Sequence, residues 1–227
     1  INEIKYKYSK EFIKRLDDKC IELDENLFKI QSSKLFDEEI VSIQETEELF
    51  EKHYKYMPLF RRSQKIKRVI ISKLKDKRDE LVREANKQAK EKIAALNADE
   101  LVIEQNNIEF QRRLRIREIV RELMDAKIRL EQWIENDNVV NIYKEMMNIE
   151  KLSYLDLAPI LYLMIKLDGK KVKKEIRHIV IDEAQDYSML QFIVLKELTG
   201  CRSYTIVGDA NQRLVKAEEE SAMLRLK

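Results

Sequence analysis

The stretch Arg177–Asp186, which reads Arg-His-Ile-Val-Ile-Asp-Glu-Ala-Gln-Asp, joins a short apolar run directly to a cluster of acids. Three consecutive β-branched residues, Ile179–Ile181, predict a central strand covered on both faces. Asp182 and Glu183 follow at its carboxyl end, where ligands bind in open α/β sheets. One carboxylate there can hold Mg²⁺ and the next can activate water for attack on a phosphate. Acidic pairs after strands are also common as solvated caps.

A second strand is predicted at residues 204–207, and it runs into Gly208-Asp209-Ala210-Asn211-Gln212. Between the two strands, Ser188 is placed to cap a helix that stops at Gly200. The order strand, helix, strand predicts a right-handed βαβ unit of a parallel sheet.

Together the two acidic stretches resemble motifs II and III of the superfamily 1 helicases, the UvrD/Rep-like group. The resemblance covers Leu152–Leu214, and its most specific parts are Asp-Glu-Ala-Gln-Asp-Tyr-Ser at 182–188 and Gly-Asp-x-x-Gln at 208–212. Within the group, residues 153–159 and 178–192 look most like the branch of helicase IV and the HelD-type proteins, which act on bacterial RNA polymerase.

The resemblance implies roles for individual residues. Asp182 would hold Mg²⁺ through its water shell, and Glu183, also near the metal, would be the general base. Gln212 would sense the γ-phosphate, while Asp209 would position that glutamine or couple it to the translocating strand. The residues that brace one motif against the other would be Gln185 and Asp186.

The chain departs from the group after the second strand. It has Ala210-Asn211 where UvrD and Rep have acids, and the aromatic residue that commonly stacks a base after Gln212 is missing. This departure bears on processive unwinding more than on ATP hydrolysis.

Composition favours long helices, because 38% of the 227 residues are charged and the chain has only three Gly and two Pro. The net charge of +2 neither requires nor excludes a nucleic-acid partner. Cys20 and Cys201 lie far apart in a chain without a signal peptide or a membrane-spanning run. We therefore expect reduced thiols, a cytoplasmic location and no membrane partner.

Residues 1–150 are expected to form a helical insertion, an arm like domain 1B of the group. Apolar residues recur every three or four positions from Ile4 to Leu27, which predicts one amphipathic helix. Residues 27–36 are predicted to form a small hairpin. Ser42, with Glu three residues later, and Pro58 mark the starts of further helices.

Two long apolar stripes follow, from Ile66 to Leu96 and from Ile116 to Ile134. The polar segment Asn97–Asn107 between them is predicted to turn, so the two helices would pack as an antiparallel hairpin. Trp133 near its base is expected in the core rather than as a platform for a nucleic-acid base.

Residues 151–227 are expected to be part of motor domain 1A, a P-loop NTPase (RecA-like) domain with a parallel sheet. The chain lacks the phosphate loop Gly-x-x-x-x-Gly-Lys-Ser/Thr, which we expect before Ile1. The chain would then be an internal fragment. Mg²⁺ and ATP would be cofactors of the full-length protein, and the fragment alone would bind neither and be inactive.

Two basic clusters are candidate contacts for a nucleic acid or a protein partner. Their members are Arg61, Arg62, Lys65, Lys67 and Arg68, then Arg112, Arg113, Arg115 and Arg117. Such runs are either solvated helix faces with acidic partners or contacts to a phosphate backbone or an acidic groove. Their positions predict that they lie at opposite ends of the hairpin, which favours only weak binding of DNA.

The resemblance thus implies a fragment of an ATP-dependent DNA helicase or translocase. The alternative is that the helical part is the protein-binding arm of a HelD-type ATPase that remodels or recycles bacterial RNA polymerase. Acids at the predicted tip, Asp99, Glu100 and Glu104, would repel DNA and suit a basic protein channel.

Overall fold

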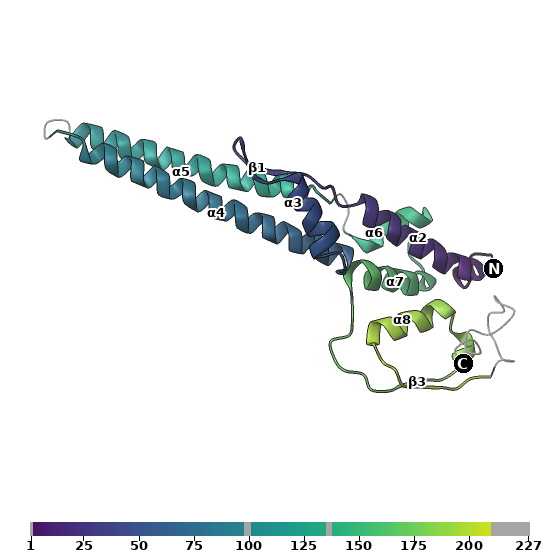
Figure 1. Cartoon of the computed structure of the whole chain (residues 1–227). Helices are drawn as coiled ribbons and strands as arrows, with labels where there is room; N and C mark the ends of the chain where they lie inside the picture. The colour runs from purple at the N-terminus through teal and green to yellow at the C-terminus, as the bar shows by residue number, and fades with distance from the viewer. Residues whose placement is uncertain (1, 98–100, 135–137, 210–227) are drawn as a thin grey trace. The chain divides into compact units, whose positions relative to one another are not determined.

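The computed structural model describes residues 2–97, 101–134 and 138–209, which are mostly helical with a small partial sheet, as expected (Figure 1). Packing divides the chain into two compact units. Unit 1 comprises Ile1–Phe28, Met57–Arg61 and Asn136–Lys227, and unit 2 comprises Lys29–Tyr56 and Arg62–Glu135. The predicted division into a helical insertion, 1–150, and a partial motor domain, 151–227, stays a prediction.

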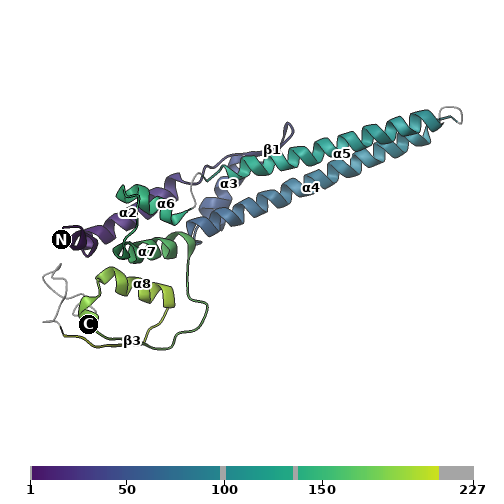
Figure 2. The ribbon, with the colours of Figure 1, turned by 180° about the vertical axis from the view of Figure 1, so that it is seen from behind.

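Unit 2 is built on a helical hairpin of α4 (Leu59–Ala94) and α5 (Leu101–Glu131), which lie side by side in Figures 1 and 2. The Lys67 ammonium donates to the Glu131 carboxylate at 2.8 Å, and the Arg112 guanidinium donates to the Asn86 side chain at 2.7 Å. Both pairs fit one antiparallel register, so the predicted hairpin is confirmed. With 36 residues, α4 is about 54 Å long at 1.5 Å per residue.

The two apolar stripes supply much of the interior of unit 2, but the predicted stripe on α5 is wrong at Val120, which is 42% exposed. The fully buried side chains include Ile66, Ile70, Leu74, Ile119 and Leu130, and Trp133 is buried as expected. The predicted turn is too long, because α5 already begins at Leu101. The polar residues Glu104–Asn107 are exposed but helical, so polarity alone does not predict a turn. Asp99 and Glu100 lie outside the described residues.

A β-hairpin of β1 (Ser33–Leu35) and β2 (Glu38–Val41) packs beside these helices in unit 2. The predicted hairpin over residues 27–36 is therefore shifted. Phe36 adopts a positive φ of 53° in the turn, so the chain reverses after Leu35 rather than before it. Ser42 caps α3 (Ile43–Glu48), as expected, and α3 continues as a π-helical turn, Leu49–His53.

Unit 1 begins with two helices where one was predicted, α1 (Asn2–Lys7) and α2 (Lys10–Asn26). The break occurs because Ser9 caps α2, accepting a 3.1 Å hydrogen bond from the Phe12 backbone N–H. The unit continues with α6 (Val139–Met147) and with α7 (Leu157–Asp168), which a 3₁₀ turn at Tyr154–Asp156 precedes. No helix among the described residues is long and apolar enough to cross a membrane.

A buried ion pair joins distant parts of unit 1. The Lys7 ammonium donates to the Asp156 carboxylate at 2.6 Å, and the Tyr143 hydroxyl donates to the same oxygen. The other carboxylate oxygen accepts from the Ser153 backbone N–H and hydroxyl, both at 2.7 Å. Burial alone would raise the pKa of Asp156, but these hydrogen bonds lower it to about 2.

The sheet of unit 1 has β3 (Ile179–Ile181) parallel to β4 (Tyr204–Ile206), with α8 (Met189–Thr199) between them in sequence. This confirms the predicted parallel strands and the cap at Ser188. One face packs on a core of Ile181, Ala184 and Phe192. The prediction of a strand covered on both faces is wrong for the described residues, because Val180 is 69% exposed.

Candidate functional site

The turn after β3 presents two carboxylates to solvent. Asp182 and Glu183 are both exposed, and a carboxylate oxygen of Asp182 accepts a 2.9 Å hydrogen bond from the Glu183 backbone N–H. Glu183 adopts φ 48° and ψ 41°, the left-handed region that L-residues rarely occupy. Such a residue costs of order 1–3 kcal/mol and persists only where its surroundings hold it. The turn therefore lifts both acids out of the strand at the carboxyl end of the sheet.

Gln185 connects this turn to the loop after β4. Its side-chain NH₂ donates to the Glu183 carboxylate at 2.5 Å, and its side-chain carbonyl accepts from the Asp209 backbone N–H at 3.0 Å. Backbone bonds continue the link, because the Ala184 N–H donates to the Val207 carbonyl at 3.0 Å. The two acidic stretches that sequence analysis paired are thus joined directly.

Gly208 allows this close approach. A Cβ atom there would collide with the side-chain oxygen of Gln185 and would lie 2.9 Å from the Ala184 backbone nitrogen. The requirement for glycine comes from this steric contact, since Gly208 is not among the residues with positive φ. The pattern Gly-Asp pointed to this loop, but only the fold shows why the residue lacks a side chain.

The remaining candidates of the two stretches are Asp186, Asp209 and Gln212. Asp186 is half-buried and, after burial itself, its charge is the next cause of a raised pKa at Tyr8. Asp186 thus lies near α1. Asp209 is exposed at the end of the loop, and Gln212 lies outside the described residues.

The model of the UvrD/REP helicase N-terminal domain matches residues 6–214. The chain belongs to this family. The UvrD/REP helicases are ATP-dependent enzymes that use Mg²⁺ and bind DNA. No curated protein sequence matches the chain.

In this UvrD/REP helicase domain, the described site fits Mg²⁺ only in part. Mg²⁺ keeps several waters and is bound by one or two carboxylates together with substrate phosphates. Asp182 and Glu183 supply two exposed carboxylates at the correct edge of the sheet, and no third candidate ligand gathers with them among the described residues. A metal there would depend on phosphate oxygens for the rest of its shell.

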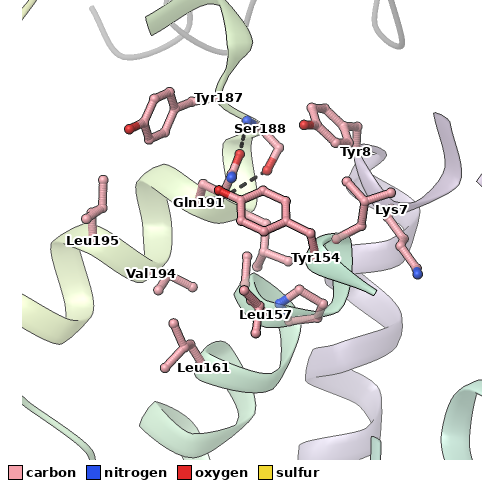
Figure 3. A pocket seen from close by; sticks show the side chains of 14 residues that line it. Lys7, Tyr8, Tyr154, Leu157, Leu161, Tyr187, Ser188, Gln191, Val194 and Leu195 are labelled. Atoms are coloured by element: carbon pink, nitrogen blue, oxygen red, sulfur yellow. Dashed lines mark hydrogen bonds between the residues drawn. The ribbon is translucent and has the colours of Figure 1, made fainter. Parts of the chain in front are cut away.

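A cavity of about 260 Å³ lies beside Tyr187 and Ser188, on the side of α7 and α8 (Figure 3). Tyr8, Tyr154 and Tyr187 line it together with Leu157 and Val194. Its one cation, the ammonium of Lys7, is held by the buried Asp156. A triphosphate needs positive charge, and this cavity is apolar and offers no available cation. The cavity is therefore separate from the candidate nucleotide site.

One arginine of the first basic cluster in this UvrD/REP domain is buried. Arg62 is 2% exposed and stacks on the ring of Phe50, 4.0 Å from its centroid. Its side chain is therefore unavailable as a surface contact, contrary to the prediction. The exposed cations of the cluster are Arg61, Lys65 and Arg68.

The second basic cluster lies at the middle of α5 rather than at one end of the hairpin, so the predicted placement at opposite ends is wrong in part. Arg112 pairs with Glu109 at 2.8 Å, and Arg115 pairs with Glu118 at 3.1 Å. These two arginines match the interpretation of a solvated face with acidic partners. Arg113 and Arg117 are exposed and make no ion pair within 4.0 Å among the described residues.

Sequence analysis missed the role of His178. Its two ring nitrogens lie 2.7 Å from the Ser203 hydroxyl and 2.9 Å from the Thr205 hydroxyl. The ring thus ties the start of β3 to β4. A histidine directly before an apolar strand carries no local signal for such a cross-strand contact, so only the pairing of the strands could reveal it.

Proposed function

We propose that this chain contributes motifs II and III to the motor of an ATP-dependent DNA helicase or translocase, within a P-loop NTPase domain of type 1A. The observation that supports this function is the link through Gln185, which joins the Glu183 carboxylate to the backbone of Asp209. A motor needs its hydrolytic acid to respond to a neighbouring element, and one side chain here contacts both.

In this proposal the two acids of the turn have different roles. Asp182 would hold Mg²⁺ through its water shell, and the metal would supply positive charge toward the phosphates. Glu183 accepts the proton of the water whose oxygen attacks the γ-phosphorus, and ADP departs as the leaving group. The strained turn helps, because it projects Glu183 from the sheet while Gln185 fixes the direction of its carboxylate.

Asp209 and Gln212 extend the proposal to coupling. The Asp209 backbone N–H donates to Gln185, which in turn donates to Glu183. A movement of the loop after β4 would therefore shift the Glu183 carboxylate. We assign Gln212 to sensing the γ-phosphate on the basis of the family motif alone. Backbone amides and a lysine of a phosphate loop, which the chain lacks, would hold the nucleotide.

The test uses a purified full-length protein that carries this chain. Hydrolysis of ATP is measured with Mg²⁺ or with a chelator, each with and without a single-stranded oligonucleotide. We expect hydrolysis that requires Mg²⁺ and rises when DNA is added. Hydrolysis that depends on neither Mg²⁺ nor DNA, or no hydrolysis under any condition, would contradict the function.

A second candidate function is that α5 belongs to a protein-binding arm. One face of α5 packs on α4, yet large apolar side chains also occupy the opposite face. These exposed residues are Ile103, Phe110, Val120, Met124 and Ile128. Spacings of four, seven and fourteen residues bring most of them onto one stripe. Arg113, Arg117 and Arg121 lie among them and give the stripe positive charge.

A phosphate backbone would use the arginines and gain nothing from the apolar side chains, whereas a protein surface with acidic flanks would use both. Core bacterial RNA polymerase is the probe that the HelD resemblance suggests. We expect Phe110→Asp to weaken binding of the full-length protein to it, and Gln111→Asp, an exposed control off the stripe, to have little effect. Equal behaviour of the two variants would refute this second function.

A further inference from the structure

The segment between α7 and β3, residues 170–177, concentrates positive charge. It holds four lysines and one arginine against one acid, Glu175. Its net charge is therefore larger than the +2 of the entire chain. Figures 1 and 2 show it as an open loop that leaves the end of α7 and runs to the start of β3.

Most charges of this loop are not neutralised within unit 1, although the Lys170 ammonium lies 3.3 Å from the Asp168 carboxylate. Lys171, Lys173 and Lys174 are exposed and make no ion pair within 4.0 Å among the described residues. The pair of Arg177 with Glu175 spans 3.8 Å, and both side chains are about four-fifths or more exposed. An ion pair of that kind contributes little, so Arg177 also remains available to a partner.

The loop is nevertheless held in position at both ends. The Val172 backbone N–H donates to the carbonyl of Leu198 in α8 at 2.8 Å. His178 then bonds the Ser203 and Thr205 hydroxyls of the neighbouring strand. A fixed loop presents its charges with less loss of conformational freedom on binding than a free tail would.

The position of the loop separates it from the nucleotide site. It enters β3 at the amino end, whereas Asp182 and Glu183 follow the carboxyl end. β4 runs parallel to β3, so exposed Arg202, two residues before β4, lies at the same edge as the loop. The cations therefore gather away from the carboxylates that would meet a triphosphate.

We propose that residues 170–177, with Arg202, bind the phosphate backbone of a nucleic acid. The proposal rests on the function inferred above, since it assigns a second contact surface to the same DNA substrate. Six exposed cations with only one large exposed apolar side chain, Val172, favour a polyanion over a folded protein surface. Lysine suits this use because it contacts phosphates as a point charge without reading bases.

The experiment measures binding of the 227-residue chain to a fluorescent single-stranded oligonucleotide at several salt concentrations. Each phosphate contact on a single strand contributes about 0.7 to the slope of log affinity against log salt. Changing Lys171, Lys173 and Lys174 together to Ala should therefore make this negative slope shallower by about 2. It should also weaken binding roughly tenfold or more at low salt. Changing the same three to Arg should preserve both quantities.

The control variant changes Lys75, Lys87 and Lys90 to Ala, which removes the same charge from exposed positions of α4. It should leave the slope nearly unchanged. An equal loss in the control, an unchanged slope in the loop variant, or no binding by the unaltered chain would each overturn the inference. DNA-stimulated hydrolysis by the full-length protein is an independent readout. If the loop variant binds DNA normally but hydrolysis still rises with DNA, the proposed function holds and only the role of this loop is wrong.

Discussion

The backbone N–H of Asp209 donates a hydrogen bond to the side-chain carbonyl of Gln185, with the two atoms 3.0 Å apart. The NH₂ group of the same amide donates to the Glu183 carboxylate. Because Gln185 is buried, water cannot easily replace either partner. One side chain therefore sets both the direction of the proposed base and the position of the loop after β4.

The first prediction concerns this link. Gln185→Ala should remove about 1 kcal/mol of net hydrogen bonding and free the Asp209 amide, whose hydrogen exchange should become faster. Gln191→Ala is the control, because it removes the bond to the Ser188 N–H at the start of α8 but leaves the link between the strand ends intact. If exchange at Asp209 is equally fast in both variants, Gln185 does not hold the loop.

The second prediction concerns Gly208. Gly208→Ala should destabilise the chain by about 1–3 kcal/mol, because the added methyl meets backbone as well as a side chain. The double variant with Gln185→Ala should recover only part of this loss, since the contact with the Ala184 nitrogen remains. Denaturant unfolding of the two single variants and the double variant measures this. Complete recovery would mean that the Gln185 side chain is the sole obstacle.

Gly200→Ala is the matched comparison. Gly200 has φ +65° and open space around its Cα, so alanine there is strained by its backbone alone. We expect it to lower global stability without faster exchange at Asp209. A changed exchange rate there would show that the loop responds to general destabilisation rather than to the local contact.

Local signals in the sequence predicted much of this site. The β-branched run of β3, the cap at Ser188 and the glycine that ends α8 all act within a few residues, and each is found where expected. The coverage of β3 could not be predicted this way. An apolar run shows that a strand can be buried on both faces, but the exposure of Val180 depends on which distant segments pack on the sheet, and no local pattern carries that information.

The third prediction concerns the ion pair of Lys7 and Asp156. Asp156→Asn should destabilise the chain by about 3–5 kcal/mol near neutral pH, because it leaves a buried ammonium without its counter-charge. Lys7→Met should cost less in the Asp156→Asn background than alone. Urea unfolding of the four proteins completes the cycle. Independent, additive losses would contradict a coupled pair.

The same pair gives a pH dependence. The folded-state pKa of Asp156, about 2, lies below the ordinary value of 3.8, so its contribution is complete above about pH 4. It is lost as the pH falls toward 2 and amounts to about 2 kcal/mol at 1.36 kcal/mol per unit. The stability difference between the unaltered chain and Asp156→Asn should therefore shrink over this range. A constant difference would show that the carboxylate is not the source.

The fourth prediction compares two faces of α5. Leu123 is buried in the interior of unit 2, and Leu123→Ala should cost about 2–5 kcal/mol. Phe110 is 58% exposed, and Phe110→Ala should change the free energy of unfolding by less than about 0.5 kcal/mol. Urea unfolding measures both. A large loss at Phe110 would show that its ring stabilises the folded chain and is not a free docking residue.

Contacts between distant residues explain most of what sequence analysis missed. Lys7 and Asp156 are far apart in sequence, and neither stands out among the many charged residues of the chain. Arg62 stands among basic neighbours in the sequence, although its helical position turns it onto Phe50. The hairpin, in contrast, was predictable because its two apolar stripes repeat over many turns without glycine or proline.

The most direct test of the central claim is the hydrolytic role of Glu183. In a full-length protein that carries this chain, Glu183→Gln keeps an acceptor for the Gln185 NH₂ group but removes the group that takes up the proton. Steady-state hydrolysis should fall by roughly 10²–10⁴-fold while ATP binding persists, whereas Asp182→Asn should weaken Mg²⁺-dependent binding. Hydrolysis at the original rate by the Glu183→Gln protein would contradict the account and would leave Glu183 as a solvated acid at the end of a strand.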